Sequence, residues 1–166
     1  MPATLCRIVL ECSGAMCLMA GGYLLLLLRL WPRVFLRRYP EAVRKVVPPL
    51  SSRERTIGFV VTIPFLLSLL AFPAWASFRM ARDSTAGYAE LFLAAYLTWT
   101  AFNLFDWLVL DELVIGLGRP SWLVLKGAEH VPMMFDHAEH AIAFAKGAVG
   151  GVIVSTAVAA IALFWR

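Results

Sequence analysis

The chain has 166 residues, of which 61% are apolar and only 16% are charged. Soluble domains average about 45–50% apolar and about 25% charged residues. So few charged side chains cannot cover the surface of a soluble fold of this length, and so apolar a chain does not stay disordered. The composition therefore predicts an integral membrane protein.

Four apolar runs have the length that a transmembrane helix needs, ~20 residues for a hydrocarbon core of ~30 Å. Backbone polar groups in lipid must be paired within helices or closed barrels, and the runs lack the polar–apolar alternation of barrel strands. We therefore predict an all-α polytopic membrane protein, a four-transmembrane-helix bundle that forms a single domain over residues 1–166. The predicted spans are residues 8–28, 57–78, 88–109 and 141–165.

The second span carries two local signals. Ser51 and Glu54 have the spacing of a capping box, which predicts that the helix begins there. Pro64 and Pro73 lie inside the run and are predicted to kink it, because each removes a backbone hydrogen bond and crowds the preceding turn.

Basic residues are distributed unequally between the two sides of the predicted bundle. The loop of residues 29–55 and the loop between the third and fourth spans hold ten Lys and Arg, and the opposite side holds four. By the positive-inside rule, the loop of residues 29–55 is cytoplasmic and both termini lie outside, as in a multi-pass protein of the bacterial inner membrane. The net charge of +4 then indicates contact with anionic headgroups of the lipid bilayer, and no nucleic acid is expected as a partner.

Two loop segments leave alternatives open. Residues 31–40 alternate apolar and basic side chains, which is typical of an amphipathic segment lying on the membrane, although a docking surface for a cytoplasmic partner fits as well. The loop of residues 113–134 contains several Gly and Pro residues around an apolar stretch. It is either an ordinary interfacial loop or a lid over the polar residues that flank it.

Polar residues concentrate at the two helix ends that this loop joins. Taking the third span as an α-helix, Asn103 and Asp111 lie at about 60° and about 140° from Asp106, on one broad face. Asp136 and His140 lie one turn apart at the start of the fourth span. Burying such charges singly would cost ~2.5–3.5 kcal/mol each. We therefore predict that these five residues converge in one pocket in the cytoplasmic half of the bundle.

Five further polar residues are secondary candidates. Glu11 lies inside the first span and is either wetted at the interface or functional. Glu112 is predicted to point away from the two aspartates, and Lys146 lies two turns into the fourth span. His137 and His140 lie three apart on one helix and cannot occupy opposite axial positions of one iron, which argues against haem. The secondary candidates are Glu11, Glu112, His137, Glu139 and Lys146.

A divalent metal is one hypothesis for the cluster. One His with several carboxylates suits Zn²⁺, Mn²⁺ or Fe²⁺ better than a soft metal. The ligands would be Asp106, Asp111, Asp136 and His140. The chain lacks a complete metal motif such as His-Glu-x-x-His, so the cofactor is left undecided by the sequence.

Small residues recur every four positions along the fourth span, and this ridge predicts close helix packing. Its members are Ala143, Gly147, Gly151, Ser155 and Ala159. The third span, the first span and a second subunit are all candidate partners, and the last would give a homo-oligomer through Gly147 and Gly151.

The order of several short motifs resembles that of small uncharacterised four-span bacterial integral membrane proteins. The motifs are Tyr39-Pro40, Pro48-Pro49-Leu50-Ser51, Asn103-x-x-Asp106, Asp111, Arg119-Pro120 and Asp136-x-x-x-His140. The resemblance implies no activity, cofactor or substrate, and it does not include Glu112, His137 or Glu139.

Three classes of function follow from these features. The first is a proton or cation pathway or site, since intramembrane Asp and His serve such relays. The second is a membrane-embedded enzyme, metal-dependent or not, that acts on a lipid or another apolar substrate with Asp and His as acid and base. The third is a structural or accessory membrane subunit whose polar residues hold helices together.

Overall fold

The computed structural model describes residues 2–82, 85–132 and 136–165, and these residues form helices and loops with no β-strand. η1 and η3 are π-helices, and η2 and η4 are short 3₁₀-helices. The elements in chain order are α1 (Pro2–Met16), η1 (Cys17–Gly21), α2 (Gly22–Leu30), η2 (Pro32–Arg38), α3 (Glu41–Val46), α4 (Ser52–Ala81), α5 (Tyr88–Phe105), η3 (Asp106–Leu117), η4 (Ser121–Leu123) and α6 (His137–Phe164).

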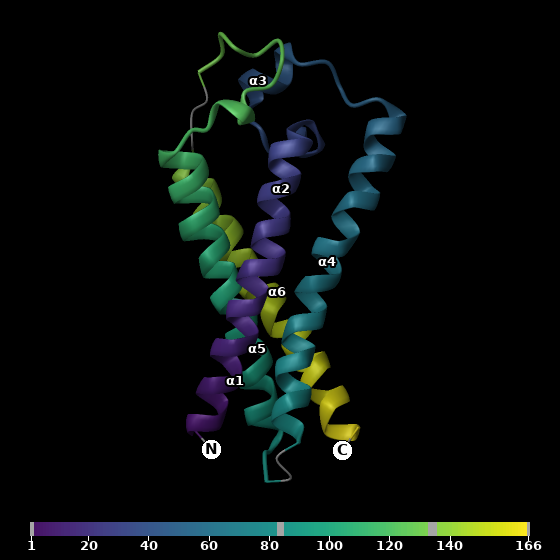
Figure 1. The fold of residues 1–166 in the computed structure, drawn as a ribbon, viewed down its shortest axis with the longest axis vertical. Coiled ribbons are helices and arrows are strands. Elements are labelled where there is room, and N and C mark those ends of the chain that lie inside the picture. Colours follow the sequence, from purple (N-terminus) through teal and green to yellow (C-terminus); the bar gives the residue numbers. More distant parts are fainter. Residues whose placement is uncertain (1, 83–84, 133–135, 166) are drawn as a thin grey trace.

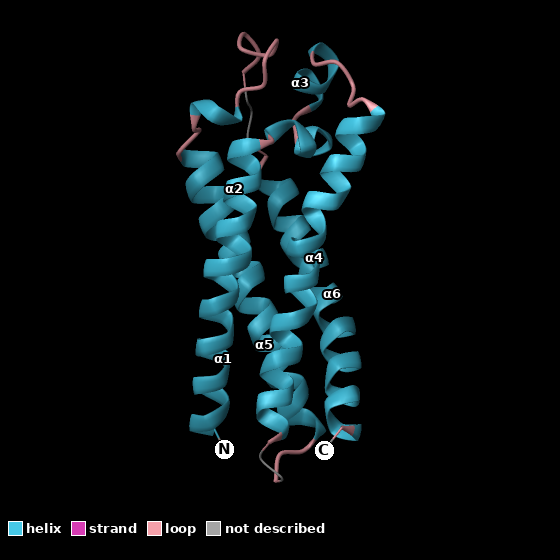
Figure 2. Cartoon of the chain, turned by 45° about the vertical axis from the view of Figure 1, so that its right-hand side comes forward, coloured by secondary structure: helices cyan, strands magenta, loops and turns pink. Residues whose placement is uncertain are grey.

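The long helical segments run alternately up and down along the long axis of the molecule (Figure 1). α1, η1 and α2 form one continuous segment, and η3 continues α5 directly. The N- and C-terminal ends lie at one end of the molecule, which we call the terminal end. The short elements η2, α3 and η4 lie at the opposite end, which we call the loop end (Figures 1 and 2).

Three helices are long and apolar enough to cross a membrane: Ala3–Leu30, Ser52–Ala81 and His137–Phe164. The first two contain the predicted first and second spans and extend beyond both ends of each, and the third covers all of the predicted fourth span except its last residue. The predicted third span, residues 88–109, falls on α5 and the start of η3 and is not one of these three. The structure thus supports a membrane protein with an all-helical fold.

Helix α4 begins as the sequence predicts. The Ser51 hydroxyl accepts a hydrogen bond from the Glu54 amide at 3.2 Å, and the Glu54 carboxylate accepts one from the Ser51 amide at 2.8 Å. This confirms the capping box. α4 then continues as one helix through both Pro64 and Pro73. Pro73 is itself buried against neighbouring helices, and this packing keeps the helix continuous where a backbone hydrogen bond is missing.

The apolar core has three layers along the bundle. Near the terminal end, side chains from all four long segments pack together with almost no exposed surface, among them Cys12, Met80, Leu91 and Ala159. A middle layer contains Met16, Ala20 and Phe102. At the loop end, η2 and α3 pack against the loop after η4; this layer contains Leu36, Tyr39, Val43, Val47, Leu125 and Ala128.

The loop-end layer changes the interpretation of residues 31–40. Their buried apolar side chains, Leu36 and Tyr39, face the protein and not a lipid surface. The segment bends because Trp31 ends α2 in a non-helical conformation and Pro32 begins η2. The apolar side of an amphipathic segment can pack against lipid or against protein. Here it packs against the loop after η4, which is distant in sequence.

The small-residue ridge of α6 packs against α5. A Cβ atom on Gly147 would lie 2.5 Å from Asn103 Oδ1, and a Cβ on Gly151 would lie 2.7 Å from Trp99 Nε1. Trp99 Nε1 donates a hydrogen bond to the Gly147 carbonyl at 2.9 Å. Further along the ridge, Ser155 and Ala159 are fully buried. The partner of the ridge within this chain is therefore α5, and a homo-oligomer through the same glycines stays a prediction.

We expect Gly151→Leu to destabilise the protein, because a branched side chain at 151 overlaps the Trp99 indole. Overpacking of this kind costs ~1–3 kcal/mol or more. The measurement is thermal unfolding in detergent.

Gly22→Leu is the matched control, because Gly22 is exposed on α2 and a Cβ atom there meets nothing within 4 Å. Equal stability of the two variants would show that the α5–α6 contact is looser than described.

Candidate functional site

A cavity of about 820 Å³ lies between the long helices in the loop-end half of the bundle. All five residues of the predicted pocket line it: Asn103, Asp106, Asp111, Asp136 and His140. Deeper in the bundle the wall is apolar and aromatic, and the residues that form it are Leu24, Leu28, Phe65, Leu69, Trp99, Phe102 and Phe144. The cavity is therefore polar at the loop end and apolar toward the middle of the bundle.

The two aspartates reach the cavity through the π-helical geometry of η3. In an α-helix, residues five apart are separated by about 140°. A π-helix closes its hydrogen bonds between residues five apart, so that such residues lie one above the other. Asp106 is the first residue of η3, and Asp111 follows five positions later. The wider helix therefore aligns the two carboxylates more closely than the α-helical pattern predicts.

Asp111 and His140 form the closest polar contact in the cavity wall. The distance from His140 Nδ1 to Asp111 Oδ2 is 2.7 Å, and the side chains are 28% and 23% exposed. If Asp111 is ionised, its carboxylate can only accept, and Nδ1 of His140 is then the donor of this hydrogen bond. This is the arrangement in which a carboxylate orients a histidine for proton transfer.

A second His–carboxylate contact lies outside the first. His137 Nδ1 is 2.6 Å from Glu112 Oε2, and the His137 side chain is 71% exposed. Trp107 Nε1 donates to the other Glu112 oxygen at 3.3 Å, and the Trp107 ring stacks on Phe144 with centroids 4.9 Å apart. Glu112 is not among the residues that line the cavity, and its contact with His137 joins η3 to α6. Both pairs thus fasten the start of α6 to η3.

Asn103 has a different partner from the one its position suggests. The pattern favours an amide that orients a neighbouring carboxylate, but Asn103 Nδ2 donates to the Phe144 carbonyl at 2.9 Å. It lies against Gly147 on α6, where the missing side chain leaves room for an amide. Asn103 therefore contributes to helix packing as well as to the cavity wall.

The remaining candidates occupy separate places. Asp136 is the N-cap of α6, and its Oδ1 accepts from the amides of Ala138 at 2.9 Å and Glu139 at 3.1 Å. Glu139 lines the cavity, and Lys146 is exposed on α6.

Glu11 lies in the terminal-end half, where Arg79 Nη1 is 2.6 Å from its Oε2. Glu11 therefore has an ion-pair partner and takes no part in the cavity.

The carboxylates and histidines of the cavity do not assemble into a metal centre. Within residues 2–82, 85–132 and 136–165, no three His, Cys, Asp or Glu side chains are grouped so that they could hold a metal ion. The hydrogen bonds of Asp136 and Asp111 are made instead to the α6 amides and to His140.

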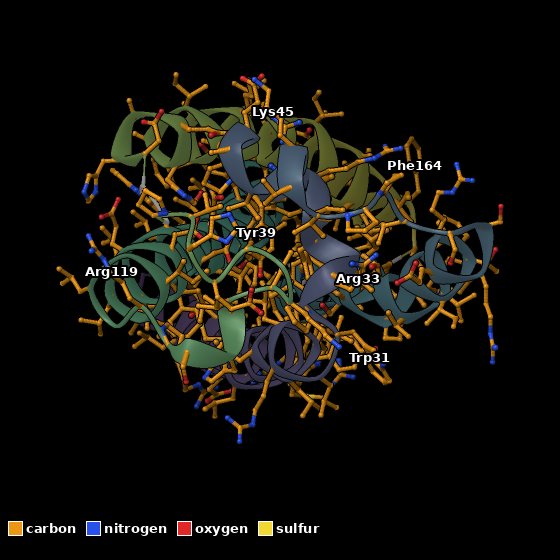
Figure 3. The ribbon with its side chains drawn as sticks, turned by 90° about the horizontal axis from the view of Figure 1, so that it is seen from above. Trp31, Arg33, Tyr39, Lys45, Arg119 and Phe164 are labelled. Carbon is orange, nitrogen blue, oxygen red and sulfur yellow. The ribbon has the colours of Figure 1, made fainter. Side chains whose placement is uncertain are left out.

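The cavity also has arginine side chains that the sequence pattern did not assign to it. Arg37, Arg38 and Arg44 line its loop end, on η2 and α3. These elements are held in place by Tyr39, whose hydroxyl donates to the Leu123 carbonyl at 2.9 Å; burial raises the pKa of Tyr39 to about 12. Tyr39 lies near the middle of the bundle when it is viewed from the loop end (Figure 3). Basic residues in a loop beside a membrane are usually interpreted as a sign of topology. For this reason the sequence pattern did not assign these arginines to the cavity.

No protein-family model matches this chain, and no match was found among curated proteins or solved structures.

We expect nitrogen NMR of histidine-labelled protein to show a hydrogen on Nδ1 of His140, strongly hydrogen-bonded to Asp111. Asp111→Ala should remove that signature from His140 and leave His137 unchanged, because His137 bonds to Glu112. Glu112→Ala is the reciprocal control. A change at both histidines in either variant would mean that the two pairs are not independent.

Proposed function

We propose that this chain is a four-span membrane protein whose cavity binds an amphiphile, and that His140 transfers a proton at its polar end. The observation that carries the proposal is the division of the cavity wall. An oriented His140–Asp111 pair lies at one end, and an aliphatic and aromatic surface lies at the other. Its volume of about 820 Å³ falls within the range of small-molecule sites, roughly 300–1,000 Å³.

A binding or catalytic site accounts for the core better than a transmembrane pathway does. A proton or cation pathway needs polar groups or water through the whole bundle. The terminal-end half is filled instead by a closely packed, mainly apolar layer in which Cys12, Met80, Leu91 and Ala159 are fully buried. The cavity therefore opens toward one end only.

A purely structural role accounts for less of the arrangement. Polar side chains that hold membrane helices together bond directly across the interface, as Trp99 and Asn103 do. Asp106 instead lines open space beside the His140–Asp111 pair. An ionisable side chain inside a membrane protein costs free energy. Binding of a ligand by Asp106 would explain why the chain has an acid at this position.

The proton transfer follows from the pair. His140 takes up a proton at Nε2 as a polar group of the ligand loses it, and the Asp111 carboxylate stabilises the imidazolium so formed. Return of that proton from Nε2 to the ligand restores the neutral ring, so that the protein gains and loses no proton overall. Positioned acid–base groups of this type contribute ~10²–10⁴-fold in rate.

Membrane labelling tests the binding step. Purified protein in vesicles is irradiated with diazirine-tagged amphiphiles (a fatty alcohol, a diacylglycerol and a phospholipid), and labelled peptides are mapped by mass spectrometry. We expect label on Phe65, Leu69 and Phe144. Ala143→Trp should abolish it, because Ala143 lines the cavity, whereas Val149→Trp should not, because Val149 is exposed elsewhere on α6.

The proton-transfer step is tested by comparing the wild-type protein with a variant that lacks the imidazole. Wild-type and His140→Ala proteins are each incubated with a total lipid extract, and the extract is profiled by mass spectrometry. Wild type should convert a lipid that the variant leaves unchanged, while both take up label in the cavity. Identical profiles would reduce the proposal to binding, and label restricted to outward-facing residues would reject the cavity itself.

The fourth span and the orientation are part of the same proposal. We place α5 and η3 across the membrane, with the loop end in the cytoplasm because it carries the excess of basic residues. With the three native cysteines replaced, a cysteine at Arg44 should be inaccessible to an impermeant thiol reagent added outside, and one at Asp83 accessible. Labelling of the Arg44 position from outside would reverse the orientation.

A further inference from the structure

Three arginines line the loop end of the cavity: Arg37 and Arg38 of η2 and Arg44 of α3. These elements are fixed at several points. Arg33 Nε donates to Glu54 Oε1 at 2.9 Å, which ties η2 to the start of α4. Tyr39 ties the same segment to η4 through the Leu123 carbonyl. We call Arg37, Arg38 and Arg44 the arginine roof.

Several acids of the cavity are already engaged within the chain. Lys45 Nζ is 2.9 Å from Glu41 Oε1, and this hydrogen bond holds the pKa of Glu41 below its usual value. Asp111 bonds to His140, and Asp136 caps α6. These three carboxylates therefore have hydrogen-bond partners other than the arginine roof.

The arginine roof itself has no such engagement. Among the residues that the structure describes, Arg37, Arg38 and Arg44 form no ion pair with a carboxylate within 4.0 Å. Of the acids that line the cavity, Asp106, Asp136 and Glu139 likewise form no ion pair among these residues. In the part of the chain that the structure describes, the arginine roof thus places three guanidinium groups at the loop end of the cavity, and none of them has a carboxylate partner within 4.0 Å.

Guanidinium groups bind phosphate and carboxylate oxygens through paired, charge-assisted hydrogen bonds. An anionic group beneath the arginine roof would lie beside His140, while the chains attached to it would reach the apolar wall of Leu69 and Phe102. We propose that the ligand of this cavity is an anionic amphiphile whose phosphate or comparable oxyanion is bound by Arg37, Arg38 and Arg44. This inference rests on the proposed function and names its ligand class.

The test compares two probes in maltoside detergent, short-chain phosphatidic acid and the diacylglycerol with the same chains, with binding measured by calorimetry. We expect the phosphatidic acid to bind at least about tenfold more tightly, equivalent to ~1.4 kcal/mol. The Arg37→Gln, Arg38→Gln, Arg44→Gln triple variant should lose that preference while its affinity for diacylglycerol stays the same. Should the triple variant not fold, Arg38→Gln alone should lose about threefold.

A second triple variant is the matched control. Arg29→Gln, Arg53→Gln and Arg55→Gln removes the same charge from the same end of the molecule, at exposed positions that do not line the cavity. It should bind both probes as wild type does. Equal losses in the two triple variants would overturn the inference, since general attraction of anions to a basic surface would then explain the binding.

The remaining outcomes separate this inference from the proposed function. If wild type binds both probes equally, the amphiphile cavity stands and the arginine roof does not select an anion. If wild type binds neither probe and the diazirine label does not reach the cavity, the proposed function itself fails. Displacement of phosphatidic acid by millimolar inorganic phosphate would assign the site to a free anion and overturn the amphiphile.

Discussion

The close approach of α5 and α6 at Gly147 and Gly151 is the constraint on which the rest of the structure depends. Because these residues lack side chains, Trp99 and Asn103 lie directly against α6 and donate hydrogen bonds to its backbone carbonyls. In lipid there is no hydrophobic force between helices, so this packing and these bonds supply the attraction. The contact fixes α6 relative to α5. It therefore also fixes the position of His140, which lies about two helical turns before Gly147 in α6, relative to Asp111.

The π-helix η3 is the second constraint, and it operates where this contact ends. Beyond Asn103 the helix widens, which brings Asp106 and Asp111 onto one side, facing the cavity. π-Helices are rare, and most occur as single-turn bulges within α-helices, frequently at functional sites. The contacts of η3 include the Asp111–His140 and Glu112–His137 pairs. The same bonds that position the histidine therefore also hold the irregular helix.

Much of this fold could be predicted from periodic features, and the rest depends on contacts distant in sequence. Hydropathy located the helices that are long enough to cross a membrane, and the small-residue spacing located the tight face of α6. The π-helix could not be predicted, since angles counted at 100° per residue assume a regular α-helix. The partner of Asn103 and the cavity role of Arg38 were missed for a related reason. An amide and a guanidinium bind whatever a distant segment brings within reach, and here these are the Phe144 carbonyl and the cavity mouth.

The two halves of the bundle differ in packing density: side chains fill the interior of one half, and the other half contains the cavity. Near the terminal end, small and medium side chains fill the interior completely, as a stable core requires. Toward the loop end, Phe65, Phe102 and Phe144 line open space, although the same kinds of residue could have filled it. Side chains leave a space of about 820 Å³ between the helices here, where a packed core would be filled by interdigitating side chains. A chain that packs one half so closely and leaves the other half open, beneath an ordered arginine roof, has a structure suited to holding a ligand there.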